Sequence, residues 1–378
     1  MFDRLYVHVP FCVKKCHYCA FISKTPEENE LAEYPALLLR ELQLHVSAAG
    51  PVASVYFGGG TPSLLQPLQL ARLLEGVAAQ SGIRADAEIT LEANPGSVDR
   101  ISLSGFRDAG INRISLGIQS FDDRFLECLG RIHTAEQSRQ AFRDAREAGF
   151  NNVSIDLIHS LPGQTLRQWR AELQHAIELT PEHISIYGLT VEEGTPFARI
   201  YPAESHGLPD DDLSADMYEL ADELLTASGF EHYEIANYAR PGYRSDHNNG
   251  YWKRDGYVGL GVAAHSFLRE GYGVRFSNPD NLEEYREWVM SGQPANIGEH
   301  RLTQGDAMAE YMFLGLRLAE GVSLPAFERE FGRSLESVYG STAADLIRFG
   351  LLIQNKSVLT LTRRGMLLSN QVFSKFLP

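Results

Sequence analysis

Six short runs of β-forming residues alternate with helical segments in the first half of the chain, and this alternation limits the possible fold more than any other feature. The runs lie at residues 5–9, 54–57, 88–92, 113–118, 153–158 and 183–187, and the helical segments at residues 33–46, 67–80, 134–148 and 166–179. Strands that alternate with helices form a parallel sheet through right-handed crossovers. We therefore predict an α/β fold, a partial or complete parallel (β/α) barrel, with its chemistry at the carboxyl ends of the strands.

The pattern changes after about residue 300. Helices are predicted at residues 307–318, 324–331 and 335–349, before a β-ribbon at residues 351–361. A chain of 378 residues exceeds the usual size of one hydrophobic core. We predict a barrel domain with an extension at residues 1–300 and a small C-terminal winged-helix-like α+β domain at residues 301–378. Winged helices bind nucleic acid or serve as packing and partner modules, and the acidity of the chain favours the second role.

The charge and hydropathy of the chain bear on its partners and location. The formal net charge is −15, which opposes the phosphate contacts that most nucleic-acid binding needs, so we predict no nucleic-acid partner. No apolar run reaches the roughly 18–20 residues that cross a bilayer, and no basic segment with an apolar signal core opens the sequence. We expect a cytoplasmic protein without a transmembrane segment.

Three of the four cysteines, Cys12, Cys16 and Cys19, lie within eight residues. Soft thiolates select iron–sulfur clusters, zinc or Cu(I), and three thiolates on a [4Fe–4S] cluster leave one iron without a protein ligand. A structural zinc site is the alternative, with His8 or His17 as the fourth ligand, in a protein that acts only as a scaffold. Cys128 stands alone, and we interpret it as a buried small hydrophobe on a helix.

The spacing Cys-x3-Cys-x2-Cys, with aromatic Tyr18 before the last cysteine, resembles the cluster loop of the radical S-adenosylmethionine (radical SAM) superfamily. This resemblance implies that the open iron binds the amino and carboxylate groups of S-adenosylmethionine, and that an electron from the reduced cluster cleaves its sulfonium. The cofactors expected are therefore a [4Fe–4S] cluster and S-adenosylmethionine. The barrel would be of the radical SAM type.

Further motifs resemble the oxygen-independent coproporphyrinogen oxidase group from residue 5 to about residue 377. The resemblance implies that the cofactor contacts Tyr6 in the run Leu5-Tyr-Val-His-Val-Pro-Phe-Cys12, and that Tyr18 lies beside its adenine. It assigns Gly59, Gly60 and Thr61, after the second strand, to the amino-acid end of the cofactor, where backbone can approach closely. Alternatively, Tyr6 is only a core residue. A run of three glycines is by itself weak evidence for a cofactor site.

Four polar residues near strand ends extend the same ring of contacts. By the same resemblance, Glu92, Gln119, Arg131 and Asp156 meet the bound nucleoside. An acid inside an apolar strand is costly unless it is paired or hydrogen-bonded, so a site role for Asp156 is physically reasonable. A structural salt bridge between Arg131 and Asp156 is the competing interpretation.

Two classes of this group remain: enzymes that decarboxylate coproporphyrinogen III, and heme chaperones that deliver heme to acceptor proteins. The decarboxylases carry a long N-terminal extension and a fourth cysteine two residues after the third. In this sequence Cys12 lies close to the start, and Phe21 occupies the fourth cysteine position. Both departures are typical of the chaperones. We predict heme as a further cofactor and an unidentified heme-acceptor protein as a partner, whereas the oligomeric state and the turnover of S-adenosylmethionine stay open.

The stretch Asp246-His247-Asn-Asn-Gly-Tyr251-Trp252 resembles the His-Asn-x-x-Tyr-Trp signature of the chaperones, and its glycine is interpreted as adding flexibility. Neutral imidazole is the usual axial ligand of heme iron, so His247 is the leading heme contact, with Tyr251 and Trp252 packed on the porphyrin. His265, in a second segment that resembles the chaperones, is another candidate. Alternatively, the two histidines only tie loops together through ring N–H bonds.

Overall fold

The computed structural model describes residues 2–45, 50–202, 207–293 and 298–377. The six predicted strands are present and run parallel to one another: β1 (Arg4–Val9), β2 (Val52–Gly59), β3 (Ile83–Ala93), β4 (Arg113–Gln119), β5 (Val153–His159) and β6 (His183–Gly188). The helices of the crossovers are α1 (Glu30–Leu44), α2 (Pro67–Ser81), α3 (Arg100–Asp108), α4 (Asp123–Cys128), α5 (Ala135–Glu147) and α6 (Leu166–Glu178). The predicted α/β fold is confirmed.

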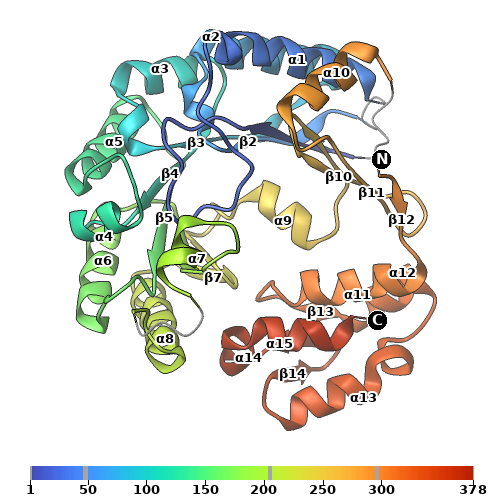
Figure 1. The fold of residues 1–378 in the computed structure, drawn as a ribbon. Helices are drawn as coiled ribbons and strands as arrows, with labels where there is room; N and C mark the ends of the chain where they lie inside the picture. Colours follow the sequence, from blue (N-terminus) through green and yellow to red (C-terminus); the bar gives the residue numbers. More distant parts are fainter. Residues whose placement is uncertain (1, 46–49, 203–206, 294–297, 378) are drawn as a thin grey trace.

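The large sheet has 12 strands in the order β12-β11-β10-β9-β1-β2-β3-β4-β5-β6-β8-β7. The added strands are β7 (Glu231–Glu234), β8 (Asn237–Ala239), β9 (Tyr257–Leu260), β10 (His265–Leu268), β11 (Val274–Ser277) and β12 (His300–Arg301). Because β12 and β7 are its two edges, the sheet is an open, curved, partial barrel (Figure 1). The extension adds helices α7 (Pro196–Ile200), α8 (Asp211–Ala227), α9 (Asp246–Trp252) and α10 (Leu282–Ser291).

Alternate residues of each strand face the outer helices and the concave side of the sheet. On β2, Val55 and Phe57 are fully buried in the main hydrophobic core, whereas Ser54 and Tyr56 hydrogen-bond to residues on the concave side. Three of the helices begin with a threonine capping box, in which Thr134, Thr165 and Thr303 each exchange hydrogen bonds with the third helical residue. The concave face is therefore lined with polar groups, and helix α9 lies inside its curve (Figure 1).

The C-terminal region has the predicted helices and ribbon. Its helices are α11 (Gln304–Gly315), α12 (Leu324–Phe331), α13 (Leu335–Arg348), α14 (Arg363–Leu367) and α15 (Ser369–Phe373), beside the antiparallel sheet of β13 (Val322–Ser323), β15 (Val358–Leu361) and β14 (Leu352–Asn355). This region has its own hydrophobic cluster. The division at residue 300 remains a prediction. In the described part of the chain, no helix is long and apolar enough to cross a membrane.

Candidate functional site

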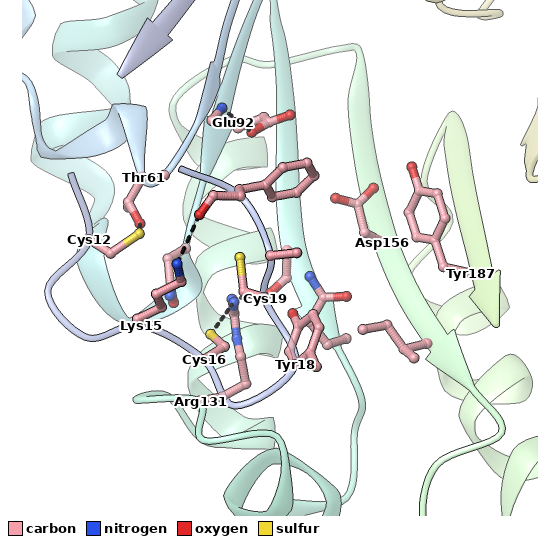
Figure 2. A pocket seen from close by; sticks show the side chains of 18 of the residues that line it. Cys12, Lys15, Cys16, Tyr18, Cys19, Thr61, Glu92, Arg131, Asp156 and Tyr187 are labelled. Atoms are coloured by element: carbon pink, nitrogen blue, oxygen red, sulfur yellow. Dashed lines mark hydrogen bonds between the residues drawn. The ribbon is translucent and has the colours of Figure 1, made fainter. Parts of the chain in front are cut away.

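A cavity of about 460 Å³ opens at the carboxyl ends of the parallel strands. Nearly all of the predicted cluster and cofactor residues line it: Cys12, Cys16, Tyr18, Cys19, Gly59, Gly60, Thr61, Glu92, Gln119, Arg131 and Asp156. Figure 2 shows the three cysteines on one side and Asp156 and Tyr187 on the other. The curvature of the sheet thus gathers residues that lie more than 140 positions apart in the sequence (Cys12 and Asp156) around a single space.

The cysteine loop is fastened to the barrel by its own backbone and by His17. The ring Nδ1 of His17 lies 3.0 Å from the carbonyl oxygen of Cys128, and its backbone N–H donates to the carbonyl of Leu129. Two side chains approach the sulfurs: Thr61 Oγ1 lies 3.6 Å from Cys12 Sγ, and Arg131 Nη1 lies 3.5 Å from Cys16 Sγ (Figure 2). These two side chains therefore place hydrogen-bond donors beside the sulfurs of the cysteine loop.

The spacing of the cysteines bears on the zinc alternative. A single zinc ion draws its thiolates to about 2.3 Å from one point. Within residues 2–45, 50–202, 207–293 and 298–377, no group of three or more histidine, cysteine or acidic side chains is arranged to hold a metal ion. In a [4Fe–4S] cluster each thiolate binds a different iron, so the sulfurs stay farther apart around the cube. All three cysteines line one cavity, so each could bind a different iron of a single cluster.

Two buried carboxyl groups face the cavity. Burial raises the pKa of Glu92 to about 7, although its carboxylate accepts hydrogen bonds from Tyr56 at 2.8 Å and from the backbone N–H of Gly59 at 3.3 Å. Burial also raises the pKa of Asp156, which accepts from Ser115. The two acids oppose each other's ionisation. A polar ligand with hydroxyl groups would supply the missing hydrogen bonds here.

Arg131 and Gln119 also fit a polar ligand. Arg131 donates through Nη2 to the carbonyl of Gly117 at 2.7 Å, and its Nε is buried without a partner in the described structure. Gln119 Oε1 is likewise buried without a partner there, at a residue with a φ of 67°. No ion pair joins Arg131 to Asp156 among the described contacts, so the salt-bridge interpretation is wrong for this conformation. Unsatisfied buried polar atoms of this kind are typical of sites that a ligand completes.

Tyr6 and the glycine motif have structural roles of their own. Tyr6 is not among the described residues that line the cavity; its hydroxyl is 3.0 Å from His8 Nδ1 and its ring stacks on Tyr56. A Cβ on Gly60 would lie 2.6 Å from the carbonyl oxygen of Phe11, and Gly59 has a φ of 108°. Close packing against Phe11 therefore requires Gly60, and the positive φ favours glycine at position 59, whatever the cavity binds.

The structure adds cavity residues that the sequence did not suggest. Tyr187, near the end of β6, is 44% exposed and lies beside Asp156 in the lining of the cavity (Figure 2). Lys15 lines the opening and donates to the carbonyl of Phe21 at 3.1 Å. The position of Tyr187 at the end of a predicted strand was a usable signal, because the carboxyl ends of parallel strands carry the sites of such folds.

The proposed heme residues lie away from this cavity. His247 is 1% exposed, and both ring nitrogens are 2.8 Å from hydroxyl oxygens, of Ser54 and of Tyr251. Both ring nitrogens are engaged in hydrogen bonds in this conformation, and His247 as an axial ligand of heme stays a prediction. Trp252 stacks on the guanidinium of Arg317, and Tyr251 is half-buried. His265, at the start of β10, is exposed.

Comparisons with known proteins identify two matching families. The Radical SAM superfamily model matches residues 6–176, and the HemN C-terminal domain model matches residues 302–368. Heme chaperone HemW of Lactococcus lactis is 36% identical over 375 residues, which cover 99% of this chain and 97% of the relative. Heme chaperone HemW of Escherichia coli is 43% identical over 264 residues, 69% of each chain.

A solved structure supports the fold. Coproporphyrinogen III oxidase (HemN) from Escherichia coli, described as a radical SAM enzyme, superimposes with a TM-score of 0.85 over 99% of this chain and 90% of that chain. At 24% identity this likeness concerns the fold alone. The 36% identity to a heme chaperone over nearly the whole of both chains identifies the family within this fold more narrowly. The chain belongs to the radical SAM superfamily and, within it, to the family of the heme chaperones HemW.

Proposed function

We propose that this protein is a cytoplasmic heme chaperone that carries a [4Fe–4S] cluster and S-adenosylmethionine and transfers heme to an acceptor protein. The observation that carries the proposal is the 36% identity to a heme chaperone over nearly the whole of both chains. The exposed Phe21, where the decarboxylases carry a fourth cysteine, also favours the chaperone. The alternative is an oxygen-independent coproporphyrinogen III oxidase, with which the match to the HemN C-terminal domain model is compatible.

In this proposal Cys12, Cys16 and Cys19 hold the cluster, and the cavity residues hold S-adenosylmethionine. When bound, the cluster can supply one electron to the sulfonium. Arg131 would donate a hydrogen bond to the Cys16 sulfur, since its Nη1 lies 3.5 Å away. Glu92 and Asp156 would accept hydrogen bonds from the nucleoside, and Gln119 would accept one through its buried side-chain oxygen. Tyr18 would close the adenine side of the pocket.

We place the axial ligand of heme at His265, because its imidazole is exposed whereas that of His247 is enclosed. A neutral imidazole at the start of an outer strand can reach a bulky macrocycle without unfolding the barrel. Tyr251 would then act through its hydrogen bond to His247, and Trp252 through its stacking on Arg317.

An anaerobic heme titration of the cluster-reconstituted protein tests the proposal. We expect one saturable equivalent, at least about tenfold weaker binding in His265→Ala, and unchanged binding in His300→Ala. His300 is a suitable control because it is also an exposed histidine on an outer strand. Equal affinities in both variants would remove His265 from the site. Turnover of coproporphyrinogen III, without saturable heme binding, would instead establish the decarboxylase.

A further inference from the structure

Helix α9, which carries the His-Asn-x-x-Tyr-Trp motif, is anchored to the concave face of the sheet. The backbone N–H groups of Asp246 and His247 donate to the two carboxylate oxygens of Glu88, at 3.0 Å each. Arg4 on β1 pairs with Asp246 at 2.9 Å and with Asp255, beyond the helix, at 3.0 Å. A carboxylate at the helix N-terminus and an arginine that joins both flanks fix the helix against β1 and β3.

His247 lies at the centre of this contact. Its Nδ1 is 2.8 Å from Ser54 Oγ, and its Nε2 is 2.8 Å from the hydroxyl of Tyr251. The imidazole also stacks on the ring of Tyr56, with centroids 5.1 Å apart and planes at 29°. Burial, together with the nearby guanidinium groups of Arg4 and Arg113, lowers the pKa of His247 to about 3. The ring is therefore neutral near neutral pH, and it serves as a fixed packing surface.

Tyr56 connects this surface to the cavity. Its hydroxyl donates to Glu92 Oε1 at 2.8 Å. Its ring stacks on the rings of His247 and Tyr6, with centroid distances of 5.1 Å and 6.2 Å. The only other hydrogen bond recorded for the Glu92 carboxylate in the described structure comes from the backbone of Gly59, at the longer distance of 3.3 Å. Tilting the Tyr56 ring would therefore remove the shorter of the two contacts that orient this carboxylate.

We propose that His247 is a positioning residue for Glu92: by supporting the ring of Tyr56, it lets helix α9 set the carboxylate that meets the nucleoside. The inference rests on the proposed function, since it takes the cavity to be the S-adenosylmethionine site. It gives the chaperone motif a role inside the barrel in place of direct contact with heme. Trp252, at the other end of α9, stacks on Arg317 at 4.2 Å, so the same helix also contacts the C-terminal region.

The test is the affinity of the cluster-reconstituted protein for S-adenosylmethionine, measured by calorimetry. We expect about tenfold weaker binding in both His247→Ala and Tyr56→Phe, the size typical of losing one hydrogen bond to a charged group. His247→Phe should recover most of the affinity, because a phenyl ring can support Tyr56, although it cannot bind iron. Iron content should stay the same in all three variants.

The dependence of binding on pH gives a second readout. The titratable and charged groups that face Glu92 are Tyr6, Tyr56, Arg113, Asp156, Tyr187 and Tyr251. Affinity for S-adenosylmethionine should fall as the pH falls through the pKa of Glu92, because its carboxylate accepts hydrogen bonds from the nucleoside. Since the Tyr56 hydrogen bond lowers the pKa of Glu92, loss of this bond should move the midpoint of that fall to a higher pH. A purely structural defect would weaken binding without moving this midpoint. An unmoved midpoint in Tyr56→Phe would overturn the proposal.

His183→Ala is the matched control. His183 is also 1% exposed, with its ring nitrogens 2.8 Å from Ser154 Oγ and from the Tyr233 hydroxyl, and the Glu92 carboxylate receives no hydrogen bond from these groups. Equal loss of affinity in His183→Ala and His247→Ala would overturn the inference, as would unchanged affinity in His247→Ala with heme binding lost. If the wild-type protein does not bind S-adenosylmethionine, the proposed function fails and takes this inference with it.

Discussion

Individual buried carboxyl groups make the stability of this fold depend on pH. Glu172, on helix α6, accepts hydrogen bonds from the hydroxyl of Ser120 and the backbone N–H of Phe121, yet burial raises its pKa from 4.5 to about 7. Between these two values the folded state keeps a proton that the unfolded state releases. This group's contribution to the free energy of unfolding therefore falls as pH rises from about 4.5 to 7.

We predict that Glu172→Gln removes this component. The free energy of unfolding of the variant, relative to the wild type, should rise between pH 5 and pH 7 by at most about 1.4 kcal/mol per pH unit. Urea denaturation at the two pH values measures the difference. Glu178→Gln, at an exposed position on the same helix, should show no such change. The same difference in the free energy of unfolding between the two pH values in all three proteins would contradict the prediction.

The fourth cysteine should be dispensable for the cluster. Cys128 packs among apolar side chains, its sulfur lies 4.0 Å from the hydroxyl of Tyr201, and its backbone carbonyl contacts His17. We predict that Cys128→Ser retains the iron and sulfide content of the wild type, whereas Cys16→Ser loses most of both. Iron and acid-labile sulfide assays after anaerobic reconstitution measure this. Loss in Cys128→Ser would make this cysteine a ligand.

At the scale of an element, helix α9 shows how a glycine can be required inside a helix. Sequence reasoning assigned flexibility to Gly250, but the structure places it within α9 against Arg4. A Cβ there would lie 1.8 Å from Arg4 Nε. The interpretation of this glycine as a source of loop flexibility is wrong, because the arginine that anchors the helix occupies the space of a side chain.

We therefore predict that Gly250→Ala destabilises the protein by about 1–3 kcal/mol, as in other overpacked interiors. Gly340→Ala, in helix α13, is the matched control, since the nearest atom to its Cβ is the flexible Glu336 side chain at 3.3 Å. That substitution should be neutral or stabilise by up to about 1 kcal/mol through helix propensity. Thermal unfolding of both variants measures the difference, and equal effects would contradict the steric argument.

At the scale of the whole molecule, the C-terminal region is joined to the sheet by a buried ionic network. Arg254 is 4% exposed and contacts Glu310 at 3.3 Å and Glu330 at 3.0 Å, while Arg275 on β11 contacts Glu310 at 2.7 Å. Removing one partner of a buried network leaves charge uncompensated, which is far more costly than breaking an exposed pair.

We predict that Glu310→Ala lowers the free energy of unfolding by about 3 kcal/mol or more. The C-terminal region should then unfold ahead of the barrel, since Glu310 joins it to two arginines beside the sheet. Glu270→Ala, which breaks only the exposed pair with Arg301, should cost less than about 1 kcal/mol. Calorimetric unfolding measures both effects, and a single unshifted transition in Glu310→Ala would show that the network contributes little.

Local sequence patterns were sufficient for much of the fold. Alternating strand and helix periodicity predicted the six parallel strands, the C-terminal helices and the ribbon, because period and capping depend on neighbouring residues. The resemblance to a known family assigned most of the residues that line the cavity, and their positions near strand ends agree with where a curved parallel sheet carries its site. The glycine motif was assigned in the same way, although its packing against Phe11 could not be foreseen.

The tertiary structure decided what those patterns leave open. The order of strands β7 to β12, the enclosure of His247, and the contacts of Tyr56 with Glu92 all depend on chain segments far apart in the sequence. A motif of histidine and aromatic residues looks the same whether it faces solvent or a barrel interior. Only the curvature and register of the sheet determine which side chains meet there, because burial is a property of the assembled fold.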